Sequence, residues 1–315
     1  MYNSENTIKQ CIDSIELQRT RFTYSILVVD DGSTDSSVSI VDGMIGIYKN
    51  ITLLRQKNMK QAEARNYGLR HSRGKYVLFI DSDDTLHLDM IEKMLIKAYS
   101  GSQLVVCDIN KIYSDKIIEE KSKLFKRNFK NKIEFLSHFL TKNKELDVGL
   151  WNKIFDLDII KQKKIKFENG NFFEDSLFVL RYLTLCSTGK VTYVNEPLYN
   201  LFRNQSSTTT SLDSKIDSRA IKYIDEVSKI LREANYVLTE QSMNAFKIRT
   251  WMYIVHHHIK YDSEWDAQRQ GETLSFISGV QYMRGCINLD ITHMLGALVA
   301  RYCPSFYQIL YRRKK

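Results

Sequence analysis

Two clusters of carboxylates each close a short apolar segment of this 315-residue chain. The clusters comprise Asp30, Asp31 and Asp35 after residues 25–29, and Asp81, Asp83 and Asp84 after residues 76–80. Crowded carboxylates repel one another unless a cation or hydrogen-bond donors lie among them. Mg²⁺ or Mn²⁺ takes oxygen ligands from one or two carboxylates and shares the rest with phosphates and water. The pattern therefore indicates a metal-assisted phosphate site, although solvated turn acids would explain either cluster taken alone.

The elements around these clusters alternate between strands and helices as far as residue 110. The pattern predicts strands at 25–29, 51–54, 76–80 and 104–107, and helices near 8–15, 36–49, 60–72 and 88–99. Such alternation predicts an α/β fold with a mainly parallel, doubly wound sheet. Ligands of these sheets bind beyond the carboxyl ends of the strands, which is where both carboxylate clusters are expected.

The alternation is lost after residue 110. Residues 115–130 are rich in lysine and are predicted to form an exposed excursion, whereas residues 131–141 have a helical pattern. The polar tract 203–210 is the predicted domain edge, and residues 216–262 read as two helices. We therefore expect one domain over residues 1–210 and a helical C-terminal region over residues 211–315.

The formal net charge of +9 is unevenly distributed. Residues 111–166 hold 15 Lys/Arg and 8 Asp/Glu, and the last 15 residues hold five Lys/Arg and no acid. A basic surface attracts nucleic acid, acidic lipid or a phosphate-bearing substrate. No nucleic-acid-reading motif is present, so we expect no nucleic acid and favour an anionic membrane surface or a lipid-linked acceptor. A merely solubilising surface is the alternative.

The location of the protein is suggested by its cysteines and its hydropathy. The five cysteines are widely spaced and form no C-x-x-C pair, so neither a disulfide framework nor a zinc site is indicated. The sequence has neither a signal-peptide pattern nor a run of about 18 apolar residues. These features predict a cytoplasmic protein, peripheral on the inner face of the cell membrane.

Four motifs occur in a defined order: Asp30-Asp31-Gly32-Ser33-x-Asp35, Ala64-Arg65-Asn66-x-Gly68, Asp81-Ser82-Asp83-Asp84 and Phe173-Glu174-Asp175. The ordered set resembles the inverting family 2 glycosyltransferases, which have the GT-A fold, and especially bacterial enzymes of capsule, exopolysaccharide and lipopolysaccharide assembly. The resemblance covers roughly residues 1–210. It implies transfer of a sugar from a nucleoside diphosphate, with UDP expected, to a lipid-linked or glycan acceptor. Residues 1–110 would bind the nucleotide and residues 111–210 the acceptor.

The resemblance also assigns roles at the donor site. Asp31 would accept a hydrogen bond from the uracil ring while Asp30 shapes the turn. Asp83 would coordinate the Mn²⁺ or Mg²⁺ that bridges the two phosphates, and Asp81 would meet either the ribose or, through water, the metal. Arg65 would meet a phosphate or, alternatively, hold Asp31 or Asp83 by an ion pair. The residues expected to bind the nucleotide sugar are Tyr2, Asp30, Asp31, Arg65, Asp81 and Arg203, and Asp84 is expected mainly as a helix cap.

On the acceptor side, the resemblance makes Asp175 the general base and Glu174 its neighbour. Inversion needs direct attack by an acceptor hydroxyl, so a carboxylate must lie within hydrogen-bond reach of that hydroxyl. Trp151 and Lys153 are expected to bind the acceptor, with core packing as the alternative for the tryptophan. The run His256–His258 is interpreted as structural, because successive helical residues point in different directions.

The family begins with a buried apolar strand, of which only Tyr2-Asn3 is recognisable in this sequence. Either the true start lies upstream or the chain is compromised. The alternative function is therefore a catalytically impaired relative that binds glycans or nucleotides. A nucleotidyltransferase is a further alternative, but it would normally show a glycine-rich phosphate loop, which this sequence lacks.

Overall fold

The computed structural model describes residues 1–168, 170, 173–203 and 213–312. The chain divides into two compact units, one formed by Met1–Asn128 and Lys144–Gln205, the other by Phe129–Asn143 and Ser206–Lys315. The first is an α/β unit, and the described residues of the second are helical apart from loops. The division differs from the expected boundary, because residues 129–143 group with the C-terminal helices.

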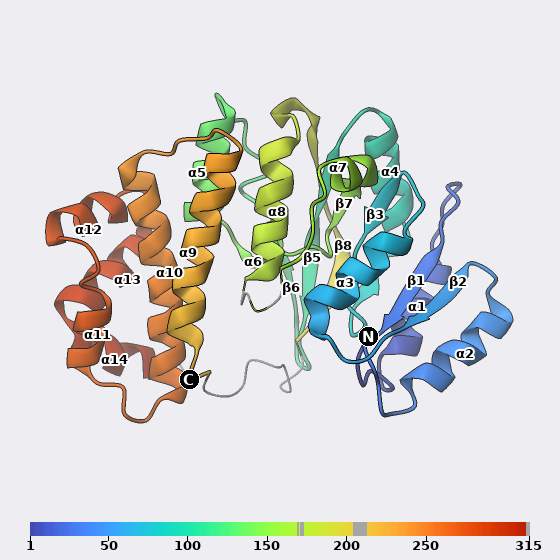
Figure 1. Cartoon of the computed structure of the whole chain (residues 1–315), viewed down its shortest axis with the longest axis horizontal. Helices are drawn as coiled ribbons and strands as arrows, with labels where there is room; N and C mark the ends of the chain where they lie inside the picture. Colours follow the sequence, from blue (N-terminus) through green and yellow to red (C-terminus); the bar gives the residue numbers. More distant parts are fainter. Residues whose placement is uncertain (169, 171–172, 204–212, 313–315) are drawn as a thin grey trace. The chain divides into compact units, whose positions relative to one another are not determined.

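Helices and strands of the α/β unit can be followed in Figure 1. Its helices are α1 (Ile8–Glu16), α2 (Ser37–Ile47), α3 (Lys60–His71), α4 (Met90–Tyr99), α6 (Glu145–Val148), α7 (Leu157–Gln162) and α8 (Glu174–Leu185), with a 3-10 turn at Thr188–Lys190. Its strands are β1 (Ile26–Asp30), β2 (Ile51–Arg55), β3 (Tyr76–Leu78), β4 (Thr85–Leu86), β5 (Leu104–Ile112), β6 (Ile117–Glu120), β7 (Lys153–Asp156) and β8 (Val191–Phe202). The strands and helices expected before residue 110 are thus confirmed, with small differences at their ends.

The described strands form two sheets. Strands β1 and β2 pair in parallel, and a six-stranded sheet has the order β3-β7-β5-β8-β4, with β6 added beside β5. Only β5 and β8 pair in parallel within the larger sheet, and its other described pairs are antiparallel. The expectation of a mainly parallel sheet is therefore corrected to a mixed one. The cause is β7, which inserts between β3 and β5 and runs opposite to both.

The start of the chain lies along the free edge of β1. The amino group of Met1 donates to the carbonyl of Val29 at 2.6 Å, and the N–H of Asp31 donates to the carbonyl of Met1 at 2.9 Å. This is the hydrogen-bond pattern of a parallel strand pair. Apart from this contact, β1 and β3 each pair with a single strand among those described.

A continuous apolar core joins the two sheets. It combines residues of β1, such as Val28, with residues of α1, α4 and β5, such as Ile12, Met94 and Val105. On the other side of β1, helix α3 approaches so closely that a Cβ on Gly68 would lie 3.3 Å from a methyl group of Val29. The carboxyl ends of β1 and β3, which carry the carboxylate clusters, are therefore fixed by packing.

The lysine-rich segment 115–130 is more ordered than expected. Residues 117–120 form β6, which pairs with the distal half of β5. Leu124 and Phe125 follow it and are buried. Most of the segment is nevertheless exposed, including Ile117 at 67% and Ile118 at 43%, so the expectation of an exposed excursion is confirmed except around Leu124 and Phe125.

The helical unit contains α5 (Lys132–Thr141), α9 (Ile216–Glu233), α10 (Glu240–Tyr261), α11 (Ala267–Thr273), α12 (Gly279–Cys286), α13 (Ile291–Tyr302) and α14 (Pro304–Arg312). Helices α9 and α10 confirm the expectation for residues 216–262. An apolar core lies among α10 to α14 and includes Ile248, Val255, Leu274 and Tyr282. None of the described helices combines the length and apolar composition of a membrane-spanning segment.

The three successive histidines of α10 face different partners. His256 contacts the hydroxyl of Tyr307 at 2.6 Å, and His257 accepts a hydrogen bond from the N–H of Asp213 at 3.1 Å. His258 contacts the carboxylate of Asp217 at 3.1 Å and stacks on the Trp265 ring. The structural interpretation of His256–His258 is therefore confirmed.

Candidate active site

The turn after β1 is shaped by Asp30. Its Oδ1 accepts a hydrogen bond from the N–H of Ser33 at 3.2 Å, and the side chain is buried. Gly32 adopts φ +79°, and a Cβ there would lie 3.0 Å from the backbone nitrogen of Asn58. Only glycine satisfies both conditions without strain. This geometry matches the turn-shaping role expected for Asp30.

The neighbouring carboxylate, Asp31, is held through one of its oxygens. Its Oδ1 accepts hydrogen bonds from Nε2 of Gln56 at 2.7 Å and from the N–H of Met59 at 2.8 Å. Among the described residues, Oδ2 has no hydrogen-bond partner. Arg65 makes no ion pair with Asp31 in the described structure, so that alternative is corrected. The Asp31 carboxylate is thus fixed in direction and retains an acceptor atom.

The first four residues connect the two carboxylate clusters. The N–H of Asn3 donates to Oγ of Ser33 at 3.0 Å, and the hydroxyls of Ser4 and Ser82 lie 2.8 Å apart. Tyr2 follows Met1, which pairs with β1, and precedes Asn3. Its side chain is 51% exposed. The structure therefore places Tyr2 at the surface beside the Asp30–Asp31 turn.

Arg65 on α3 brings together carboxylates from distant parts of the chain. Its Nη1 donates to Oε1 of Glu174 at 2.9 Å and to Oδ1 of Asp175 at 2.5 Å, and its Nη2 donates to Oδ1 of Asp81 at 3.2 Å. The arginine side chain is only 10% exposed. These ion pairs place the Asp81 cluster and the Glu174–Asp175 pair on either side of one guanidinium group.

The next residue of α3, Asn66, holds the segment that leads to Glu174. Its side-chain amide exchanges two hydrogen bonds of 2.9 Å with the backbone N–H and carbonyl of Phe167. The Phe167 ring stacks on Phe178 of α8 and lies under the Arg65 guanidinium. The sequence alone predicts no role for Asn66, although its place beside Arg65 in the same motif is a signal.

Asp83 makes no ion pair among the described residues, and its charge is influenced by Asp81 and Arg203. Burial raises its pKa, the negative charge of Asp81 raises it further, and the Arg203 guanidinium acts in the opposite direction. Arg203 itself forms an ion pair with Glu145. Arg65 does not pair with Asp83 in the described structure, so this second ion-pair alternative is also corrected. Among the described residues, the Asp83 carboxylate therefore forms no ion pair with an arginine.

The carboxylates around Arg65 outnumber the cations, so this part of the site carries excess negative charge. Three carboxylates, those of Asp81, Glu174 and Asp175, contact the buried guanidinium of Arg65, and Asp83 adds a fourth that interacts with Asp81. Burial raises the pKa of Glu174 to about 7 and also raises the pKa of Asp175, while Arg65 opposes both shifts. An oxygen-only donor set with this excess suits Mg²⁺ or Mn²⁺.

The number of available protein ligands is also informative. Among the described residues, no three His, Cys, Asp or Glu side chains converge on one point that could hold a metal ion. Mg²⁺ and Mn²⁺ sites of this kind use one or two carboxylates and complete their coordination with phosphate oxygens and water. Asp81 and Asp83 thus fit a cation that binds together with a diphosphate.

Asp84 has a different role from the helix cap that was expected. Its Oδ2 accepts from the hydroxyl of Tyr199 at 2.7 Å, and its Oδ1 accepts from the N–H of Phe202 at 2.8 Å. The N-cap residue of α4 is Asp89. Burial raises the pKa of Asp84 to about 8. Asp84 therefore fixes the end of β8, immediately before Arg203.

Lys153 is not placed to bind an acceptor. Its side chain is fully buried, and Nζ donates to the carbonyls of Leu146 and Gly149 at 2.7 and 2.6 Å and to Oδ1 of Asn152 at 2.8 Å. Burial lowers the pKa of Lys153 to about 7. The expected role is corrected: Lys153 closes the loop between α6 and β7. The sequence does not reveal that this lysine points inward.

Trp151 is likewise a core residue. It is buried, and its ring stacks on Tyr199 with the centroids 5.1 Å apart. A Cβ on Gly149 would lie only 2.6 Å from the indole, so the loop is fitted around the ring. The expectation that Trp151 stacks on an acceptor sugar is corrected in favour of the packing alternative.

Comparison with known proteins places this architecture in a family. The sequence model of glycosyl transferase family 2 matches residues 1–163, just over half of the chain. The chain is 27% identical over 253 residues to the putative glycosyltransferase EpsH of Bacillus subtilis, covering 75% of this chain and 68% of that protein. It is 29% identical over 221 residues to the cholesterol galactosyltransferase of Borreliella burgdorferi, covering 67% of this chain and 60% of that protein.

Solved structures agree on the fold. Residues 1–349 of TarS from S. aureus, crystallised with UDP-GlcNAc, match with a TM-score of 0.70 at 17% identity, covering 100% of this chain and 90% of that one. The same protein with UDP gives a TM-score of 0.68. The fold is therefore of the GT-A type. The chain belongs to glycosyl transferase family 2, and it is a glycosyltransferase.

Proposed function

We propose that this enzyme moves one sugar, with inversion, from a UDP-sugar to a lipid-linked or glycan acceptor in the synthesis of a bacterial surface glycan. The observation that carries the proposal is the Arg65 network, which joins Asp81 of the expected donor site to Glu174 and Asp175 of the expected base. The names of the relatives support transfer of a sugar, because they include a cholesterol galactosyltransferase.

The donor would lie across the two carboxylate turns. Asp31 is anchored through Oδ1, and Oδ2 can accept the imide N–H of uracil. Tyr2 is exposed next to this turn and can cover the base. Arg203 follows β8 and influences the charge of Asp83, so its guanidinium is in reach of a phosphate that binds there. UDP is preferred as the nucleotide because TarS, which shares the fold, was crystallised with UDP-GlcNAc.

Asp83 and Asp81 would hold Mn²⁺ or Mg²⁺. The cation would neutralise the charge that develops on the departing diphosphate. The protein's contribution is an excess of carboxylates in a partly buried place, where burial and then the negative charge of Asp81 raise the pKa of Asp83. Arg65 would then act as the fixed cation on the opposite side of Asp81. Its distance of 3.2 Å from Asp81 keeps that carboxylate oriented before the donor arrives.

Asp175 would act as the general base. The acceptor oxygen forms a bond to the anomeric carbon while the bond from that carbon to the phosphate oxygen breaks on the opposite face. The hydroxyl proton passes to Asp175, whose Oδ1 is held by Arg65 and whose side chain remains 28% exposed. Burial raises the pKa of this carboxylate and so makes it a better proton acceptor. Glu174 shares the same arginine and fixes its position.

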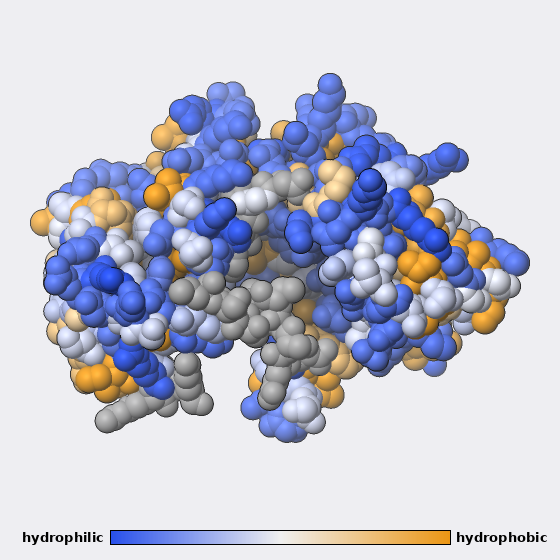
Figure 2. Space-filling model, turned by 60° about the horizontal axis from the view of Figure 1, so that its bottom comes forward, coloured by the Kyte–Doolittle hydropathy of each residue, from blue (hydrophilic) through white to orange (hydrophobic). Residues whose placement is uncertain are grey.

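The helical unit would contact the inner face of the cell membrane. Its last three helices expose apolar residues at helical spacing: Val280, Met283 and Ile287 on and after α12, Ile291 and Leu295 on α13, and Phe306, Ile309 and Leu310 on α14. Figure 2 shows apolar patches among polar residues on the surface of the helical unit. Exposed apolar residues beside a basic tail are typical of interfacial helices.

The test of the proposed function is release of UDP from a panel of UDP-sugars. Purified protein with Mn²⁺ would be incubated with UDP-glucose, UDP-galactose and UDP-GlcNAc, each with and without a membrane extract as the acceptor source. We expect UDP release from at least one donor, stimulated by the extract and absent in Asp175→Asn. Binding of UDP without release from any donor would support the impaired relative instead.

A further inference from the structure

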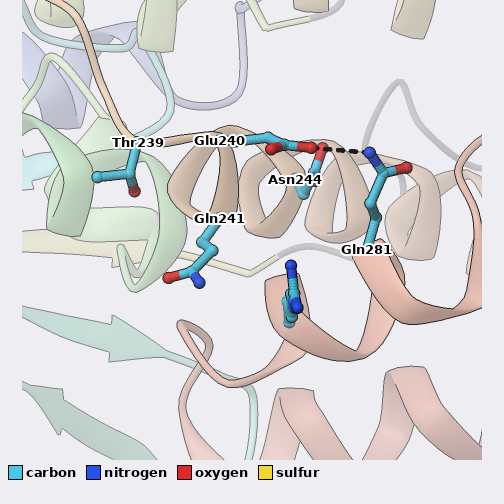
Figure 3. Close-up of a pocket in the computed structure, with 6 residues that line it drawn as sticks. Thr239, Glu240, Gln241, Asn244 and Gln281 are labelled. Atoms are coloured by element: carbon cyan, nitrogen blue, oxygen red, sulfur yellow. Dashed lines mark hydrogen bonds between the residues drawn. The ribbon is translucent and has the colours of Figure 1, made fainter.

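A polar cavity of about 320 Å³ lies between the first turn of α10 and helix α12 (Figure 3). All of its lining residues belong to the helical unit, so it is separate from the carboxylate clusters described above. It is lined by Thr239, Glu240, Gln241, Asn244, Gln281 and Arg284. The volume is at the lower end of the range of about 300–1,000 Å³ for small-molecule sites.

Asn244 forms part of the cavity wall. It is only 6% exposed, and among the described residues its side chain has no hydrogen bond. Helix α12 confines it, because a Cβ on Gly285 would lie 3.0 Å from Cβ of Asn244 and 2.9 Å from Cδ1 of Ile248. Its amide oxygen and nitrogen are not among the described side-chain atoms that are both fully enclosed and without a partner, so they open onto the cavity. A polar group that binds in the cavity can therefore reach the Asn244 amide.

The two charged residues that line the cavity, Glu240 and Arg284, have opposite charges. Oε1 of Glu240 accepts from Nε2 of Gln281 at 2.8 Å, which is the dashed contact in Figure 3. The Arg284 guanidinium has neither an ion pair nor a hydrogen bond among the described residues. One carboxylate and one guanidinium give the lining no net charge. A free anion is disfavoured further, because Glu240 already occupies the first turn of α10, where an anion would bind.

We propose that this cavity is a saccharide-binding site for a neutral sugar unit. Carboxylate, amide and guanidinium groups are planar and can each form paired hydrogen bonds with neighbouring hydroxyl groups. Typical cofactor sites are mainly apolar, whereas the side chains here are polar throughout. The site holds a glycan chain on the helical unit without taking part in the transfer reaction. The inference rests on the lining residues and does not depend on the identity of the donor or the base.

The test uses three neutral tetrasaccharides as probes: maltotetraose, cellotetraose and chitotetraose. Each would be titrated into the full chain and followed by saturation-transfer NMR and calorimetry. We expect at least one to bind saturably. Loss of one or two hydrogen bonds should weaken this binding about five- to fiftyfold in Arg284→Met and in Asn244→Ala. Arg284→Met keeps the test valid if Asn244→Ala does not fold, because Arg284 is exposed.

The matched control is Arg232→Met, which removes an exposed arginine from α9 and should leave tetrasaccharide binding unchanged. UDP affinity, measured in the same samples, should be equal in the wild type and in Arg284→Met. This separates the site from the donor site and distinguishes failure of this inference from failure of the proposed reaction. The inference is overturned if none of the three probes binds saturably, or if Arg284→Met binds them as tightly as the wild type.

Discussion

At the scale of single residues, Arg65 contacts two carboxylates that lie more than 100 positions further along the chain, and a third that is 16 positions away. Glu174 and Asp175 reach its Nη1, and Asp81 reaches its Nη2. Removing one partner of a buried ion pair is usually far more costly than the pair itself is stabilising. Substitution of Arg65 would therefore leave three carboxylates without their cation, and its effect would include theirs.

The first prediction concerns the base. Asp175→Asn should lower turnover by about 10²–10⁴-fold, the usual contribution of a general base. UDP affinity should remain close to that of the wild type, because the base acts on the acceptor. Steady-state rates and calorimetric titration with UDP measure the two effects separately. If the variant keeps more than about a tenth of the wild-type rate, Glu174 becomes the candidate base.

The second prediction concerns pH and stability. Burial raises the pKa of Glu174 from an ordinary 4.5 to about 7, so the folded protein binds more protons than the unfolded chain between these values. Stability should therefore fall as the pH rises through about 7 in the presence of a chelator. Mn²⁺ should reduce this fall because it offsets the negative charge of the cluster.

Thermal melting between about pH 5 and pH 8, with chelator or with Mn²⁺, tests this prediction. Glu174→Gln cannot ionise at that position and should flatten the chelated profile. A wild-type melting temperature that rises through neutral pH in chelator, or a Glu174→Gln profile that matches the wild type, would contradict it.

At the scale of elements, the sequence predicts local structure better than strand pairing. The strands before residue 110 are short apolar runs, and their residues suffice to identify them. The position of β7 between β3 and β5 depends on contacts between residues about 80 positions apart, such as Val77 and Phe155. The pattern of apolar residues within a short stretch of sequence carries no information about contacts between distant residues.

The same limit applies to the candidate site. The carboxylates of both clusters could be predicted because they end recognisable strands. The partners of Arg65 could not, because they follow from contacts of α3 with Phe167 and with Glu174 and Asp175 at the start of α8. The expectation that Lys153 and Trp151 bind the acceptor rests on the resemblance to the family and on the suitability of an aromatic face for a sugar ring. Whether a lysine or tryptophan points inward is decided by the surrounding packing, which the sequence does not display.

The third prediction concerns the edges of β1 and β3. Adding an apolar strand upstream of Met1 should extend the parallel pairing that Met1 already makes with Val29 and Asp31. Each additional ladder bond contributes about 0.5–1.5 kcal/mol. The extended protein should therefore melt at a higher temperature and bind UDP more tightly. A polar extension of equal length is the control, and equal melting of both extended proteins would refute the prediction.

At the scale of the whole molecule, the two units divide the expected tasks. The α/β unit holds the carboxylate clusters, and the helical unit presents exposed apolar residues and a basic C-terminal sequence. The five Lys/Arg among the last 15 residues favour an anionic surface. Apolar contact and charge should therefore act together in membrane binding.

The fourth prediction tests that membrane contact. Co-sedimentation with phosphatidylglycerol vesicles should decrease in high salt and in a chain truncated before Arg301. Phe306→Ser with Ile309→Ser removes two exposed apolar side chains and should have the same effect without removing α14. Vesicle binding that is insensitive to salt, to truncation and to the double variant would exclude this surface.

The central claim is that the two carboxylate clusters bind a nucleoside diphosphate together with a divalent cation. Calorimetric titration of UDP into the wild type, with Mn²⁺ or with chelator, and into Asp83→Ala with Mn²⁺, tests it most directly. Asp115→Ala, which changes an exposed carboxylate on the hairpin between β5 and β6, is the control. We predict that UDP binds in Mn²⁺ and that affinity falls at least about tenfold in chelator and in Asp83→Ala, but not in the control. Equal UDP affinity in all four titrations, or no UDP binding by the wild type in Mn²⁺, would contradict the account.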